Sequence, residues 1–247
     1  MQIIAGLKRF VKRCLYAHRA DEDTFLRHLR EGGAEIGQRV RIYDPQNTVI
    51  DVTRPWMLKI GDDVQITSGV TILTHGYDWS VLKGLYGQVL GSCGEVVIGN
   101  NVFIGMHTTI LKGVHIGSNC VIGANSLVNH DIDDGWVAAG NPARPIMRIE
   151  DYYEKRLDAQ LQEAQQLYDC YRQRMHTEPP AEVFDEFFWL FLPRDCETVP
   201  GWCRKKMELV GNFDESLALF RNSKARFDGY ESFLYAMRCN STAEKNS

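Results

Sequence analysis

The sequence predicts a mainly β fold, in which residues 34–147 form a left-handed parallel β-helix with α-helices on both sides. Three observations predict it: a column of aliphatic residues with a period of six, a column of turn residues, and a column of small residues. Neither the 3.6-residue period of an α-helix nor the two-residue alternation of a strand gives a period of six. Six residues fit one short strand plus one tight turn, and three such sides make a triangular coil.

The aliphatic column appears on both sides of an interruption in the middle of the predicted β-helix. It comprises Ile98, Ile104, Ile110, Ile116, Ile122 and Val128, with Ile36, Ile42, Ile60, Ile66 and Ile72 upstream in the same phase. Self-similarity at a fixed period indicates a repeat architecture. We expect these side chains to stack inside the coil as its core.

The two other columns follow three and four positions after each aliphatic residue. The turn column comprises Asp63, Gly69, His75, Asn101, His107, Gly113, Asn119, Asn125 and Asp131. These residue types tolerate the positive φ that a tight corner requires. The next column comprises Val102, Thr108, Val114, Cys120, Ser126 and Ile132. Small or β-branched residues of this kind suit a compact site that faces inward.

The hexad pattern breaks in two places. Thr48 and Arg54 stand where aliphatic residues are due, so residues 43–56 are predicted to form an irregular coil with a small excursion. Ile72 and Ile98 lie 26 positions apart, which is not a multiple of six. A loop over residues 74–95 therefore leaves the coil. Long loops on a rigid scaffold often carry function.

Residues 1–33 form a predicted N-terminal helical segment. An apolar stripe over residues 3–15 predicts an amphipathic helix, whose opposite face carries Lys8, Arg9, Lys12 and Arg13. We favour packing of this helix on the protein body, and a role at a membrane surface stays open as the alternative. A second helix is predicted near Thr24–Arg30, before Gly32-Gly33.

Residues 148–247 form a predicted α-helical extension, and the chain is expected to turn helical after Asn141-Pro142. One helix carries apolar residues at helical spacing from Leu157 to Met175, and Pro179-Pro180 end it. A second helix is predicted over 181–192, with an aromatic stripe that we interpret as core. Two weaker helices follow near Glu215–Arg221 and Tyr230–Arg238, and the tail from about residue 240 is predicted to be disordered.

Composition excludes several classes of protein. The net charge of −4 shows no basic excess for nucleic acid, and 44% hydrophobic residues is ordinary for a soluble globular protein. The apolar runs are too short for a membrane span, and the apolar start is too short for a secretory signal. Seven scattered cysteines without a CxxC pair indicate neither a disulfide framework nor a cysteine-based zinc site. We expect reduced thiols in a cytoplasmic protein.

The hexads, together with LTHGYDW at 73–79 and VAAGNPARPI at 137–146, resemble the hexapeptide-repeat acetyltransferases. The branch that looks most similar holds the maltose, galactoside, nodulation and xenobiotic acetyltransferases and the O-acetyltransferases of bacterial surface polysaccharides. The resemblance covers about residues 34–150. It implies a homotrimer with active sites between adjacent β-helices, acetyl-CoA as acyl donor, and a sugar or polysaccharide-precursor hydroxyl as acceptor.

By this resemblance His75, which follows Thr74 in a TH-x-x-D pattern, is the catalytic residue. A neutral imidazole is the usual general base for an acceptor that loses a proton as it attacks a thioester. The alternative is that His75 is merely a turn residue of its column. Asp78 would orient His75 or contact the acceptor, unless it is an ordinary loop carboxylate. Tyr77 and Trp79 would offer apolar faces to a sugar ring, or hold the loop against a neighbouring subunit.

The resemblance also maps residues that line coenzyme A. Met106 and Ala124 would contact the pantetheine arm, and Arg144 would face the nucleotide phosphates. Asn129 and His130 replace a Thr-Lys pair, so a common phosphate-side lysine is absent. Phe103 stands where many relatives carry Trp, which weakens any transfer of acceptor preference.

Three other functions compete with O-acetyl transfer. Carbonic anhydrases of this fold bind zinc with three histidines, including a pair five apart, whereas His107, His115 and His130 are spaced eight and fifteen apart. We therefore expect no metal. A non-catalytic scaffold would need neither the His75 loop nor Arg144. An N-acetyltransferase acting on an amino-sugar nucleotide stays open, because the sequence does not identify the acceptor. No cysteine fits the TH-x-x-D pattern, so we expect direct transfer in a ternary complex, with Cys93 as the nearest candidate for a covalent route.

Overall fold

The computed structural model describes residues 15–196 and 198–244, and the chain divides into two compact units, Met1–Tyr152 and Tyr153–Ser247. Residues 3–14 of the predicted N-terminal helix, with their basic face and their suggested membrane contact, lie outside the described residues. No helix in the described ranges is long and apolar enough to cross a membrane.

The first unit begins with two short helices, η1 (Ala17–Arg19) and α2 (Glu22–Glu31). Asp21 caps α2, because its carboxylate accepts a hydrogen bond from Thr24 N at 2.9 Å. Phe25 and Leu29 of α2 are fully buried in the same hydrophobic core as the isoleucine column. The helix predicted near Thr24–Arg30 is confirmed.

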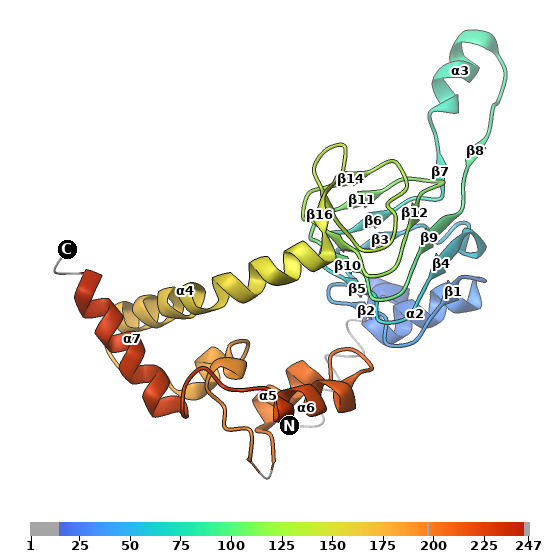
Figure 1. Cartoon of the computed structure of the whole chain (residues 1–247). Helices are drawn as coiled ribbons and strands as arrows, with labels where there is room; N and C mark the ends of the chain where they lie inside the picture. Colours follow the sequence, from blue (N-terminus) through green and yellow to red (C-terminus); the bar gives the residue numbers. More distant parts are fainter. Residues whose placement is uncertain (1–14, 197, 245–247) are drawn as a thin grey trace. The chain divides into compact units, whose positions relative to one another are not determined.

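Three sheets of short strands, parallel except for the last strand of the second sheet, form the three sides of the β-helix (Figure 1). The first sheet contains β1 (Glu35–Ile36), β4 (Leu58–Ile60), β9 (Val96–Ile98) and β12 (His115–Ile116). The second contains β2 (Arg41–Ile42), β5 (Gln65–Ile66), β10 (Phe103–Ile104), β13 (Val121–Ile122), β15 (Trp136–Ala139) and β16 (Arg144–Arg148). The third contains β3 (Val49–Ile50), β6 (Thr71–Ile72), β11 (Thr109–Ile110) and β14 (Leu127–Val128).

The predicted columns have the predicted places. Successive isoleucines pair in register, as in Ile104↔Ile66 and Ile104↔Ile122, and they are buried in one core. The turn column adopts positive φ at Asp63, Asn101, His107, Asn119 and Asn125 and at Gly69 and Gly113. At Gly69 a side chain is also excluded by space, since a Cβ there would lie 2.2 Å from His107 Nδ1.

Two corners of the β-helix are important for function. We call the turns that lead from the third sheet to the first the His75 corner, and those from the second sheet to the third the Met106 corner. The His75 corner comprises residues 51–57, 73–95, 111–114 and 129–131. The Met106 corner comprises residues 43–48, 67–70, 105–108 and 123–126.

The irregular stretch at 43–56 consists of two insertions, one at each of these corners. Ile50, and not Thr48, takes the core position of the third sheet, two residues later than the hexad predicts. Ile60 follows ten residues after Ile50, so four further residues are inserted at the His75 corner, where η2 (Pro55–Met57) forms. The two insertions together equal one hexad, which is why the upstream isoleucines keep their phase.

The loop at 74–95 is a finger with its own secondary structure. Strands β7 (His75–Gly76) and β8 (Ser92–Cys93) pair antiparallel as its stem, and helix α3 (Trp79–Tyr86), which we did not predict, ends at Gly87 with φ 76°. Figure 1 shows α3 carried away from the β-helix on this stem. None of the residues of α3 is buried, and its exposed large apolar side chains include Val81, Leu85 and Tyr86.

We predicted that the chain becomes α-helical directly after Asn141-Pro142, but a further strand comes first. The Asn141-Pro142 peptide bond is cis, and the chain then returns as β16, antiparallel to β15. The Arg148 guanidinium lies 4.8 Å from the Trp136 ring across this pair. Residues 144–148 form a strand because β15 would otherwise leave an unpaired edge, and the helix begins only at Ile149.

The second unit is helical and has a separate aromatic core. It contains most of α4 (Ile149–Met175), the 3₁₀ turns η3 (Ala181–Phe184) and η4 (Phe188–Leu190), α5 (Gly201–Met207), α6 (Phe213–Asn222) and α7 (Tyr230–Glu244). The helix predicted over 181–192 is wrong, because tight 3₁₀ turns place Phe184, Phe188 and Phe191 in the core together. The aromatic stripe is core, as predicted, and α6 and α7 confirm the two weaker helices.

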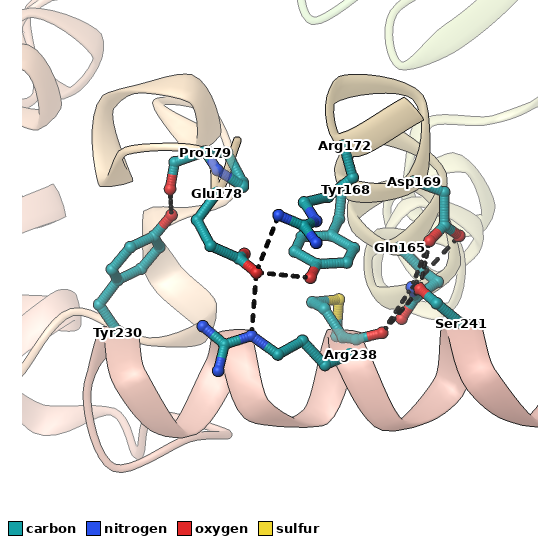
Figure 2. Close-up of polar contacts among 10 residues, drawn as sticks. Gln165, Tyr168, Asp169, Arg172, Glu178, Pro179, Tyr230, Arg238 and Ser241 are labelled. Carbon is teal, nitrogen blue, oxygen red and sulfur yellow. Dashed lines mark hydrogen bonds and ion pairs between the residues drawn. The ribbon is translucent and has the colours of Figure 1, made fainter. Parts of the chain in front are cut away.

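Polar contacts join α4 and α7 in this unit (Figure 2). Glu178 accepts hydrogen bonds or ion-pair contacts from Arg172 at 3.3 Å, Arg238 at 3.1 Å and Tyr168 at 3.4 Å. Ser241 donates to Asp169 and to the carbonyl of Met237. Helix α7, which carries Arg238 and Ser241, is described as far as Glu244.

Tyr230→Phe is expected to lower the free energy of unfolding of this unit by about 1 kcal/mol. The Tyr230 hydroxyl donates to the carbonyl of Pro179 at 2.6 Å, and the buried Pro179 would lose that partner. Denaturant unfolding followed by circular dichroism at helical wavelengths measures the change. Tyr235→Phe is the matched control, because Tyr235 lies on the same helix and is 68% exposed. Equal effects of the two variants would contradict the prediction.

Candidate active site

His75 lies at the start of the finger and contacts a buried carboxylate. Its Nδ1 lies 2.5 Å from Oδ2 of Asp51, and the two side chains are 15% and 3% exposed. Asp51 comes from the coil below, directly after β3, and its backbone N donates to the carbonyl of Ile72 at 3.0 Å. Since His75 belongs to the extended strand β7, it is not a turn residue of the positive-φ column.

Asp51 receives several other hydrogen bonds. The backbone N and Oγ1 of Thr53 donate to Oδ1 at 2.9 and 2.6 Å, and Oγ1 of Thr74 donates to Oδ2 at 2.5 Å. Burial raises the pKa of the Asp51 carboxyl, but the hydrogen bonds from Thr53, Thr74 and His75 outweigh it, so this pKa lies well below its ordinary value. Asp51 is therefore ionised over the physiological pH range.

The ionised carboxylate fixes how the imidazole is protonated. A carboxylate can only accept, so the contact to Asp51 requires a proton on His75 Nδ1. In the neutral imidazole the other nitrogen, Nε2, then carries no proton and is able to take one from a substrate. This arrangement, a base oriented by a buried carboxylate, suits general-base catalysis.

The predicted substrate residues follow His75 along the finger, and Tyr77 is the one whose ring contacts it. The rings of Tyr77 and His75 meet edge to face with centroids 5.3 Å apart, and Trp79 lies 6.0 Å from Tyr77. Tyr77 is 70% exposed, so its ring is open to a ligand. Asp78 is exposed at the N-cap position of α3, and the partner of His75 Nδ1 is Asp51 instead. The orienting role considered for Asp78 thus belongs to Asp51.

Cys93 lies directly across the finger stem from His75. The two residues are register partners in the β7–β8 pair, and the Cys93 side chain is exposed. Residues directly opposite on antiparallel strands point to the same side of the sheet. A thiol therefore lies on the side of the stem that carries the imidazole, which makes Cys93 the natural control for a covalent route.

The predicted coenzyme A residues divide between two corners. Asn129 and His130 are exposed at the His75 corner, whereas Met106 and Ala124 are exposed at the Met106 corner. These two corners lie at opposite ends of the strands of the third sheet. Arg144 is exposed in β16, and its Nη1 donates to the carbonyl of Ala143 at 2.8 Å. One chain does not bring all five residues to His75.

Sequence reasoning missed Asp51, Thr53 and the role of Thr74. Asp51 is the first residue of the inserted turn at the His75 corner, a stretch that we predicted only as an irregular coil. The failure of the hexad pattern in this stretch was the available signal. An insertion at the corner that carries the candidate base can add a residue to the site. The described part of the chain holds no group of three or more His, Cys, Asp or Glu side chains arranged for a metal ion.

A cavity of about 490 Å³ lies far along the chain from His75, in the second unit between residues 193–195 and 222–229. Arg194 lines it, but its guanidinium donates to the carbonyls of Trp189 and Leu192 and to Ser223 Oγ. Since these contacts hold the local chain together, we place the active site at His75 rather than in this cavity.

The chain is similar to known proteins over its β-helix. Residues 95–130 match the family model described as bacterial transferase hexapeptide (six repeats). Protein CapG of Staphylococcus aureus is 37% identical over 130 residues, which cover 53% of this chain and 74% of CapG. Galactoside O-acetyltransferase of Escherichia coli (strain K12) is 40% identical over 112 residues, 44% of this chain and 53% of that protein.

A solved structure is similar to this chain over part of its length. A galactoside acetyltransferase in complex with coenzyme A is 29% identical and covers 60% of this chain and 84% of that one, with a TM-score of 0.42. The hexads, the matching family model and the extent of the match to CapG lead to one conclusion. The chain belongs to the hexapeptide-repeat acetyltransferase family.

Proposed function

We propose that the protein is an acetyl-CoA-dependent O-acetyltransferase that transfers an acetyl group to a hydroxyl of a sugar or surface-polysaccharide precursor. The observation that carries the proposal is the His75–Asp51 pair at the base of an exposed aromatic finger. A sugar hydroxyl as acceptor is supported by the similarity to a galactoside O-acetyltransferase and by the exposed Tyr77 ring beside His75.

The reaction proceeds by direct transfer. The acceptor hydroxyl gives its proton to His75 Nε2 while its oxygen attacks the carbonyl carbon of the thioester. A backbone amide stabilises the oxyanion that forms. The carbon–sulfur bond then breaks, and the imidazolium returns the proton to the leaving thiolate of coenzyme A. Asp51 stays ionised throughout and stabilises the imidazolium in between.

We propose a homotrimer of left-handed β-helices with each active site between two copies. The support is the division of the coenzyme A residues between two corners of one chain. Met106, Ala124 and Arg144 of one copy would meet His75, Asn129 and His130 of the next and hold the donor between them. The exposed apolar side chains of α3 supply the surface that a neighbouring copy would cover. A cytoplasmic location fits the thiols of Cys93, Cys120 and Cys203, which form no disulfide.

Thiol release from acetyl-CoA with a panel of acceptors tests this function. The panel contains neutral sugars, glycosides and amino sugars, so that O-acetylation and N-acetylation give different products in mass spectrometry. Acceptor-dependent release of thiol with ester products supports the proposal, and amide products would replace it with the N-acetyltransferase. If coenzyme A does not bind in calorimetry, the acyltransferase fails and the scaffold takes its place.

Cys93→Ser is expected to retain activity within about twofold, because direct transfer uses no protein thiol and an exposed conservative change perturbs little. Steady-state rates of thiol release measure this, and intact mass spectrometry of the wild type after incubation with acetyl-CoA looks for an acetylated enzyme. Loss of activity in the serine variant, together with a single acetyl adduct on the wild type, would replace direct transfer with a covalent route through Cys93.

A further inference from the structure

A buried carboxylate beside a histidine can orient the imidazole in two opposite ways. When the carboxyl is ionised, it accepts from Nδ1, and Nε2 is left unprotonated. When it is protonated, its own hydroxyl donates to Nδ1, and the imidazole proton moves to Nε2. A base that must accept through Nε2 works only in the first state.

Burial by itself favours the protonated form of the Asp51 carboxyl, in which the hydrogen bond to His75 is reversed. Asp51 is 7% exposed, and desolvation favours the neutral form of a carboxyl group. Without compensating donors, Asp51 would therefore tend to hold its own proton and reverse the hydrogen bond to His75. The donors that oppose this tendency are the hydroxyls of Thr53 and Thr74 and the backbone N of Thr53.

The two threonines reach Asp51 from two different coils. Thr53 belongs to the turn inserted at the His75 corner, and it is fixed by two hydrogen bonds to Oδ1. Thr74 is 1% exposed, precedes His75 at the stem of the finger, and accepts at its carbonyl from Gly94 N at 2.9 Å. Each hydroxyl is thus held in place before substrate arrives, and both carboxylate oxygens are occupied.

We propose that Thr53 and Thr74 are positioning residues, which keep Asp51 an acceptor and thereby confine His75 to the tautomer with a free Nε2. This inference deepens the proposed function, because it presumes that His75 Nε2 is the base. It assigns a purpose to the insertion at the His75 corner: the extra residues bring a hydroxyl and an amide to the carboxylate that the regular hexad would not supply.

Thr74→Val tests the proposal, because valine keeps the shape of threonine and removes the hydroxyl. We expect kcat for thiol release to fall by about ten- to hundredfold, the loss expected for one hydrogen bond to a charged group, with little change in KM. Thr74→Ser restores the hydroxyl and is expected to recover most of the rate. Thr109→Val is the matched control, since Thr109 lies on the third sheet away from this network. The double variant Thr53→Val/Thr74→Val is expected to lose more than either single variant.

Nitrogen-15 NMR of the imidazoles gives a second readout that needs no activity. The His75 signal, identified by its absence in His75→Ala, is expected to show the proton on Nδ1 in the wild type and a shift toward Nε2 in the double variant. An unchanged tautomer in a folded double variant would overturn the proposal, as would a Thr74→Ser rate no better than that of Thr74→Val. If the tautomer shifts but no acceptor reacts in the wild type, the positioning role stands and the proposed function fails.

Discussion

His75→Ala is expected to lower kcat for acetyl transfer by about 10²- to 10⁴-fold, because the acceptor then has no base within reach. Among the described residues the side chain of His75 has one hydrogen-bond partner, Asp51, and it is 15% exposed, so the fold should tolerate its removal. Coenzyme A binding is expected to stay within a few fold, since none of the residues predicted to hold the cofactor depends on the imidazole. Thiol release and calorimetry on the same preparation measure the two quantities separately.

His115→Ala is the matched control for this variant. His115 is an exposed residue of β12 that lies outside the predicted site, and its backbone N, which alanine retains, donates to Asp131. The control should keep the wild-type rate. If His75→Ala were as active as the control, His75 would not be the base, and another proton acceptor would have to be sought.

Asp51→Asn is expected to have the second large effect, a loss of up to about 10⁴-fold, which is the loss that the matching change causes in a serine-protease triad. The asparagine amide has nearly the same shape, but it can donate to His75 Nδ1. The imidazole proton then belongs on Nε2, and the base is blocked although it stays in place. Rates at saturating acetyl-CoA measure the loss, and thermal unfolding shows whether the variant is folded.

Asp78→Asn tests which carboxylate orients His75: Asp51, as the structure indicates, or Asp78, as the sequence suggested. Asp78 is exposed and precedes α3, so its replacement should reduce the rate far less than that of Asp51. The reverse order, with Asp78→Asn inactive and Asp51→Asn active, would mean that the TH-x-x-D carboxylate orients the base. The present assignment of Asp51 would then be wrong.

The sequence predicted the β-helix well because its signal is repeated. Each hexad supplies an aliphatic residue, a turn residue and a small residue, and Ile104, stacked between Ile66 and Ile122, has the same environment as its neighbours. Periodicity could not place the strands within residues 43–56. The two insertions there together equal one hexad, so the isoleucines before and after them have the same phase. The sequence thus showed that the pattern fails at Thr48, but not that Ile50 occupies the core position instead.

The site was harder to predict, because its parts come from irregular segments. His75 stood out through its motif, but Asp51 lies 24 residues earlier in a stretch with no periodicity. Helix α3 escaped prediction because it is eight residues long, lies within an inserted loop and buries none of its residues. The 3₁₀ turns at 181–192 escaped because core packing of the aromatic residues overrides their helical spacing.

The origin of His75 and Asp51 on consecutive coils has a consequence for how activity arises. Neither coil contains a working base by itself, and the hydrogen bond between them exists only once the second coil has settled on the first. Activity therefore requires that these two consecutive coils are packed on each other. A chain in which they are apart would contain both His75 and Asp51 and would still be inactive. Recovery of activity during refolding should accordingly follow the docking of these two coils, not the formation of the helical unit.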